Sequence, residues 1–172
     1  VFRRRSATLK AIRQFLDARG YLEIESPITL AIPGGATARP FITHHHSLDM
    51  QLYLRVAQEL AIKRCLVGGF EKGYELNRNF RNEGLSTQHN PEFTMLEYNE
   101  TYLDYIDYMN FTEEMLCEAV KEVTGSLQVP YQGTTIDFGK PFRRISLRDA
   151  VLQYTDGLSE SDCSDAKKLR SI

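Results

Sequence analysis

Residues 74–97, YELNRNFRNEGLSTQHNPEFTMLE, combine two alternating runs with a polar loop between them. In an extended strand, residues two apart point to the same face. Arg81 and Glu83 are therefore expected to project together where the first run ends. Phe93, Met95 and Glu97 share a face of the returning run. Because an unpaired buried charge is costly, this mixed face predicts a site for a ligand with both negative and positive groups.

Each of these side chains has a chemistry that suits a nucleotide. The guanidinium of Arg81 can hold a phosphate and a carboxylate through forked hydrogen bonds and stabilise charge on a reacting phosphorus, which makes it the candidate catalytic residue. Glu83 can accept from an exocyclic amine, His89 can donate to phosphate oxygens, and Phe93 offers a flat face to a base. An Arg–Glu pair alone is typical of a surface salt bridge worth about 0–1 kcal/mol. The presence of Phe93, Glu97 and the HNPEF turn nearby favours a ligand-binding site over a surface salt bridge.

The patterns outside this segment predict the elements that must position it. Helices are expected at 2–19 and 57–67, strands at 21–28 and 51–56, a small-residue loop at 31–38, and an antiparallel strand pair in 74–97. Asp104 is a candidate N-cap for a helix to Thr124, with Gly125 beyond it. Further strands are expected at 127–131, 134–138 and 142–145, and Ser146 and Asp149 open one more helix. This order predicts an α+β fold with helices flanking an antiparallel sheet.

Composition limits the class of protein. The 172 residues are 42% apolar and 26% charged, which is typical of one soluble domain with a real core. No apolar run approaches a membrane span of about 20 residues, and the first residues lack the apolar block of a secretory signal. Three widely spaced cysteines favour reduced thiols and a cytoplasmic location. The net charge of −2 predicts neither a membrane nor a DNA partner.

A triplet of histidines, His44 to His46, could place two imidazoles on one strand face. No third ligand is evident in the pattern, so no metal site is expected there.

The longest motifs resemble those of a known family. FRNEG at 80–84 and HNPEFTMLE at 89–97 look like motif 2 of the class II aminoacyl-tRNA synthetases of the lysine, aspartate and asparagine subgroup. PGGATARPFITHH at 33–45 and LYLRVAQEL at 52–60 are similar to bacterial-type lysyl-tRNA synthetases. The first helix and the strand reaching Pro27 resemble motif 1, which implies a homodimer interface at Pro27.

The resemblance implies a role for each site residue. Arg81 would contact the ATP α-phosphate and the lysine carboxylate, and Phe93 would lie under the adenine. The other residues implied around ATP are Glu83, His89 and Asn90, and those implied around the amino acid are Gly35, Glu59, Glu97 and Asn99. Asn99 stands where the family usually has a tyrosine, Gln58 where it has a proline, and Ala61 where it has a tyrosine.

The implied reaction is activation of lysine by ATP and transfer of the lysyl group to tRNA, with lysine, ATP and tRNA as partners. The family's motif 3, its magnesium ligands and its anticodon-binding OB domain are absent from residues 1–172. The chain begins without a helix cap and ends in a charged stretch at 168–172, so it is expected to be a partial catalytic domain that is inactive by itself and whose Mg²⁺ ligands lie elsewhere. Two alternatives remain open: a related ligase that modifies a translation elongation factor, and a non-catalytic module that acts by dimerisation or binding.

Overall fold

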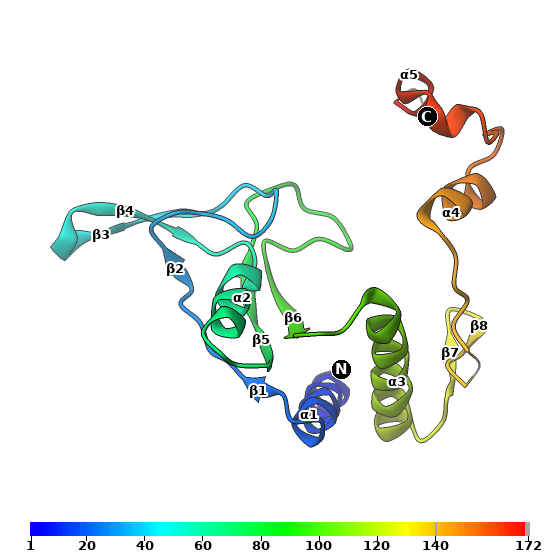
Figure 1. The fold of residues 1–172 in the computed structure, drawn as a ribbon, viewed down its shortest axis with the longest axis horizontal. Coiled ribbons are helices and arrows are strands. Elements are labelled where there is room, and N and C mark those ends of the chain that lie inside the picture. Colours follow the sequence, from blue (N-terminus) through cyan, green and yellow to red (C-terminus); the bar gives the residue numbers. More distant parts are fainter. Residues whose placement is uncertain (140, 171–172) are drawn as a thin grey trace.

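The computed structural model of the chain describes residues 1–139 and 141–170. Its main sheet has the strand order β1 (Leu22–Glu23), β5 (Lys72–Phe80) and β6 (Glu92–Glu100), as Figure 1 shows. β5 and β6 are antiparallel over nine residue pairs, whereas β1 runs parallel to β5. The register sets Asn79 opposite Phe93 and Glu75 opposite Glu97. The predicted strand pair and the α+β class are confirmed, with one parallel contact that was not expected.

A second, antiparallel sheet extends from the main body as an arm (Figure 1). It has the order β2 (Thr29–Leu30), β4 (Met50–Leu54) and β3 (Ile42–His45), with the short 3-10 helix η1 (His46–Leu48) between the last two along the chain. The expected continuous strand at 21–28 is wrong. The backbone N–H of Ser26 donates to the Glu75 side chain at 3.2 Å, so the chain leaves the sheet between the two short strands.

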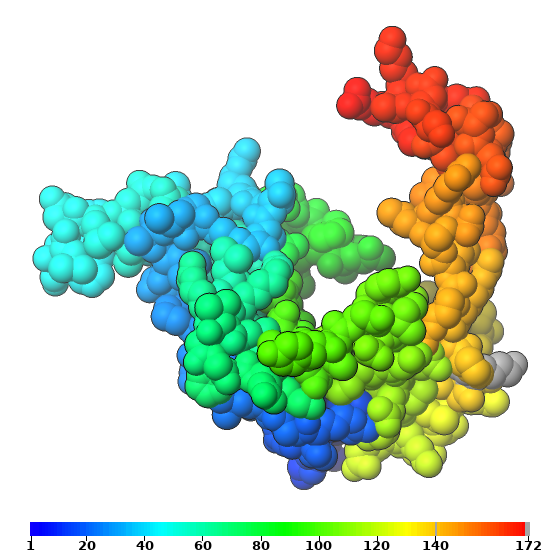
Figure 2. Space-filling model, viewed as in Figure 1, coloured from blue at the N-terminus to red at the C-terminus, as the bar shows by residue number. Residues whose placement is uncertain are grey.

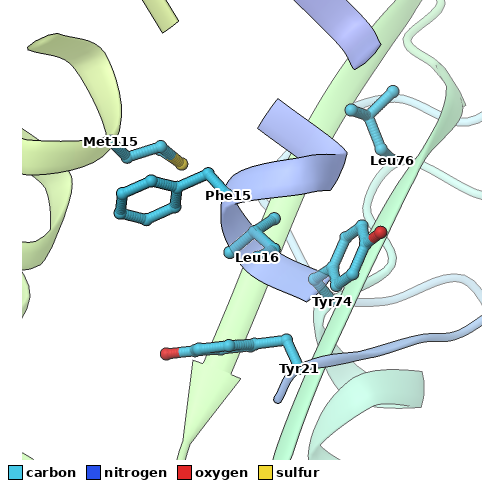
Figure 3. Packing of buried hydrophobic residues seen from close by; sticks show 6 residues of the cluster. All are labelled: Phe15, Leu16, Tyr21, Tyr74, Leu76 and Met115. Carbon is cyan, nitrogen blue, oxygen red and sulfur yellow. The ribbon is translucent and has the colours of Figure 1, made fainter. Parts of the chain in front are cut away.

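The hydrophobic core lies where α1 (Phe2–Ala18) and α3 (Tyr105–Thr124) pack together beside β5. Figure 3 shows Met115 of α3 facing Phe15 of α1, with Tyr74 and Leu76 entering from β5. The predicted caps of α3 are present, since Asp104 accepts from backbone N–H groups of the first turn and Gly125 ends the helix at φ 76°. These helices cover the face of the main sheet that carries Tyr74 and Leu76, so Glu75 and its register partner Glu97 lie on the opposite face.

Helix α2 (Glu59–Val67) packs against β5 and β6 and is visible beside them in Figure 1. It begins two residues later than the expected start at residue 57. The residues just before it, 55–58, are all buried although two of them are polar. Their contacts explain the shift, because these side chains bind the strands instead of continuing the helix.

The C-terminal part comprises the hairpin β7 (Gln128–Tyr131) and β8 (Thr134–Asp137), α4 (Leu147–Tyr154), the 3-10 helix η2 (Asp162–Ser164) and α5 (Ala166–Leu169). α4 and α5 stand away from the sheets, and Figure 2 shows a wide hollow between them and the main body. The expected strand at 142–145 is wrong. Arg144 instead pairs with Glu113 of α3 at 2.7 Å. Ser146 caps α4 as predicted, and the last two residues of the predicted charged stretch lie outside the described residues.

Candidate active site

The turn between β5 and β6 surrounds a cavity of about 440 Å³. Its lining contains every residue that the sequence predicted around a nucleotide, together with two others: Arg81, Glu83, Gly84, Gln88, His89, Asn90 and Phe93. The cavity therefore combines a cation, a carboxylate, an imidazole and an aromatic face within one loop-and-strand unit. Such a combination can bind an anionic ligand that also carries a flat ring.

Arg81 is held at the inner side of this cavity. Its backbone N–H donates to Pro91 O at 2.9 Å, which keeps it beside β6 just beyond the end of β5. Its guanidinium carbon lies 5.2 Å from the centre of the Phe93 ring, a cation–π contact. Its Nε is 3.4 Å from Val56 O, at the entry to α2. Arg81 thus lies between the aromatic wall and the segment that leads into Glu59.

The expected strand placement of Glu83 is wrong, although Glu83 does reach the cavity. β5 ends at Phe80, and the following backbone pairs with the small-residue loop, since Asn82 N donates to Arg39 O at 2.7 Å. The Glu83 carboxylate accepts from Arg39 N at 3.2 Å. The loop, rather than sheet alternation, brings Glu83 and Arg81 together.

His89 and Asn90 belong to an exposed turn at the mouth of the cavity. His89 Nδ1 and Ser86 Oγ are 2.8 Å apart, and the two residues exchange backbone hydrogen bonds of 3.2 and 3.3 Å. This small turn holds the histidine ring at the lining of the cavity.

The same face of β6 continues from Phe93 through Met95 to Glu97 and Asn99. One oxygen of Glu97, Oε2, is buried and has no hydrogen-bond partner among the described residues. Burial raises the pKa of the Glu97 carboxyl, the nearby Glu59 carboxylate raises it further, and Lys63 opposes the shift. An unsatisfied carboxylate oxygen of this kind can accept a hydrogen bond from an ammonium group.

The neighbours of Glu97 define the rest of this second half of the site. Glu59 is the first residue of α2 and forms an ion pair with Lys63 one turn later. Asn99 lies opposite Gly73 in the strand register and is half-buried. Gly35 has φ 94°, and a Cβ there would lie 3.2 Å from the Ala57 Cβ. A side chain at residue 35 would therefore crowd Ala57, just before α2, and would also adopt a strained backbone conformation.

Pro27, the predicted interface residue, does not line the cavity of Arg81. It is exposed and borders a separate small cavity of about 60 Å³ with Arg55 and Arg64.

Sequence reasoning missed a buried polar cluster beneath the site. Arg55 and Glu75 are each 1% exposed and their charged groups are 2.6 Å apart. Ser26 Oγ donates to the second Glu75 oxygen at 2.6 Å, and Arg55 Nε donates to Arg78 O at 2.9 Å. The signal was a glutamate flanked by Tyr74 and Leu76 within a strand, since a carboxylate buried there requires a cation from elsewhere in the chain.

Residues 1–139 and 141–170 contain no helix long and apolar enough to cross a membrane. Over the same residues there is no group of three or more His, Cys, Asp or Glu side chains placed to hold a metal ion. His44 of the histidine triplet instead contacts Asp49 at 3.1 Å.

The fold and the site together correspond to a known family. Residues 1–171 match the family model described as tRNA synthetases class II (D, K and N), and the chain belongs to this family. The lysine–tRNA ligase of Thioalkalivibrio sulfidiphilus is 57% identical over 171 residues, which is 99% of this chain and 34% of that protein. The lysine–tRNA ligases of Ectopseudomonas mendocina and Coxiella burnetii are 53% and 51% identical over 99% and 100% of this chain, and again over 34% of their own length. The chain thus spans about a third of the curated relatives that it matches.

Proposed function

We propose that the protein containing this chain activates lysine with ATP and transfers the lysyl group to tRNA. One observation supports this most directly. A single face of β6 carries Phe93, which lines the nucleotide-sized cavity, and Glu97, whose buried oxygen lacks a partner four residues further on. At about 3.4 Å per residue, the two lie roughly 14 Å apart along the strand. A base at one end and an ammonium at the other would place the reacting groups near Arg81.

The proposed chemistry is an in-line displacement at the α-phosphorus. A lysine carboxylate oxygen forms the new bond to phosphorus, and the bond to the bridging oxygen of pyrophosphate breaks, which yields lysyl-adenylate and pyrophosphate. A ribose hydroxyl at the 3′ end of tRNA then attacks the lysyl carbonyl and AMP leaves. Arg81 would hold the carboxylate and the phosphate together despite their repulsion and stabilise the charge on phosphorus. Positioning and electrostatics would supply the catalysis.

The amino-acid half would recognise lysine by charge. Burial raises the pKa of Glu97, and an entering ammonium would lower it again by pairing with the free oxygen. Glu59 would offer a second carboxylate at the start of α2, and Asn99 an amide beside Gly73. Gly35 would let the glycine loop close over the amino acid.

Magnesium would enter with the ATP phosphates, whose oxygens it neutralises, and its protein ligands are expected outside residues 1–172. The complete protein is expected to be a cytoplasmic homodimer, with α1 and the segment reaching Pro27 at the interface. Sedimentation of the full-length protein tests the dimer, and a monomer at micromolar concentration would contradict it.

The experiment that tests the proposed function is amino-acid-dependent exchange of pyrophosphate into ATP by the full-length protein, followed by charging of tRNA. Exchange that requires lysine, together with lysyl-tRNA as product, is the expected result. Exchange with lysine but charging only of an elongation factor would favour the protein-modifying ligase. No lysine-dependent exchange would contradict the proposal and favour a non-catalytic module.

A further inference from the structure

Gln58 is a neutral side chain in the buried cluster, at 1% exposure, and it directly precedes Glu59. Its amide nitrogen donates to Glu75 O on β5 at 2.7 Å and to Met95 O on β6 at 3.1 Å. Its amide oxygen accepts from Asn79 Nδ2 at 2.6 Å. One side chain at the entry to α2 is therefore tied to both strands of the hairpin at once.

These bonds do not cap the helix. Gln58 occupies the N-cap position of α2, but its side chain makes no hydrogen bond to the first-turn N–H groups. Side chains at this position usually satisfy those N–H groups. The amide instead spans the interface between α2 and the sheet. Its contacts serve the placement of the helix on the strands rather than the stability of the helix end.

The placement matters because two carboxylates meet across this interface. Glu59 follows Gln58 by one residue, and Glu97 follows Met95 by two residues. Glu59 lies near enough to raise the pKa of Glu97, and Glu75 acts in the same direction. Like charges repel, and Lys63, which pairs with Glu59, offsets only part of the effect of Glu59 on Glu97. The Gln58 amide is bonded to the backbone on both sides of the gap.

We propose that Gln58 is a positioning residue for the amino-acid half of the site: by binding Glu75 O and Met95 O it sets the spacing of Glu59 and Glu97, and hence the affinity for the substrate's ammonium groups. This inference rests on the proposed function. A shift of about 1 Å in a binding group can cost up to 100-fold in activity. None of the three hydrogen-bond partners of the Gln58 amide, Glu75, Asn79 and Met95, lines the cavity of Arg81 and Phe93, so nucleotide binding is expected to respond less than lysine binding.

The test measures the KM for lysine and the KM for ATP in pyrophosphate exchange, with the full-length protein. Gln58→Leu keeps the approximate volume but removes all three hydrogen bonds. Gln58→Asn keeps an amide that is one methylene too short to reach both strands. This second variant tests the inference if the leucine variant fails to fold. Both are expected to raise the lysine KM, by 10-fold or more for leucine and by a smaller factor for asparagine, while the ATP KM changes less than twofold.

Two control variants separate positioning from stability. Met115→Ala removes a buried side chain between α1 and α3, away from the site, and should lower the melting temperature without changing either KM. Gln153→Leu alters an exposed glutamine of α4 and should change nothing.

A lysine KM within twofold of the unmodified protein in a folded Gln58 variant would overturn the inference, as would an equal rise in both KM values. Absence of lysine-dependent exchange in the unmodified protein would instead overturn the proposed function, and with it the inference that rests on it.

Discussion

The buried ion pair of Arg55 and Glu75 gives the sharpest stability prediction. Replacing Glu75 by glutamine keeps the shape of the side chain but leaves the Arg55 guanidinium, 1% exposed, without its counter-ion. Breaking a buried pair in this way costs about 3–5 kcal/mol. For a domain of this size each kcal/mol shifts the melting temperature by about 2–4 °C. A fall of roughly 6–20 °C is therefore expected for Glu75→Gln.

Removing both charges should cost less than removing one. In the double variant Arg55→Met with Glu75→Leu, no charge remains to be desolvated. The Ser26 N–H, Oγ and O, the Asn77 amide nitrogen and Arg78 O each lose a partner, but these three residues are partly or fully exposed and can bind water instead. The double variant is thus expected to lose less stability than the single variant, which leaves a buried charge unpaired.

Urea unfolding at pH 7, followed by circular dichroism, measures these differences. Glu92→Gln is the matched control, because Glu92 pairs with Arg78 across the same two strands at 3.5 Å but both side chains are about half exposed. An exposed pair contributes less than about 1 kcal/mol. A loss below 1 kcal/mol for Glu75→Gln, or a double variant less stable than the single one, would refute the reasoning.

Three further predictions concern the site. Arg81→Lys keeps the charge but loses the forked geometry, so the exchange kcat should fall about 100-fold in steady-state kinetics, and a fall under threefold would contradict the role of Arg81. Glu97→Gln should lower kcat/KM for lysine about 100-fold, the loss of one charge-assisted hydrogen bond. The pKa of Glu97 is raised in the fold, so ionisation of this carboxyl destabilises the folded state increasingly as pH rises above about 4.3. In urea unfolding, Glu97→Gln should therefore be more stable than the unmodified protein at pH 7 but not at pH 4. A Glu97→Gln variant that is more stable only at pH 4 would contradict the pKa shift. Gly35→Ala should raise the lysine KM several-fold and lower the free energy of unfolding by about 1–3 kcal/mol, since φ 94° strains any other residue. An unchanged KM and an unchanged stability would show that the loop does not approach α2.

The sequence predicted the elements whose signals are local. The sequence of helix α3 contains both capping residues, and the sequence of the β5–β6 pair alternates between apolar and polar residues. The bounds of both elements were therefore predicted to within a few residues. The strand expected at 21–28 failed for a non-local reason, because Ser26 binds the Glu75 side chain instead of a neighbouring strand. Alternation alone cannot show where a backbone N–H finds its partner.

In the candidate site, too, local signals were predictive and contacts between distant parts of the chain were not. Phe93 and Glu97 were placed correctly on one face by their spacing. Glu83 reaches the cavity through its contact with Arg39, 44 residues earlier, which no periodicity could indicate. The role of Gln58 was equally hidden, since its three partners lie on two strands that follow it in the chain.

We infer that one face of β6 joins a nucleotide half and an ammonium half into a single site. The most direct measurement is a calorimetric titration of the full-length protein with a non-hydrolysable lysyl-adenylate analogue. The expected result is one site per chain, competition by both ATP and lysine, and affinity at least 10-fold weaker in Phe93→Ala and in Glu97→Gln. Binding that ATP or lysine fails to displace, or that neither substitution weakens, would contradict it.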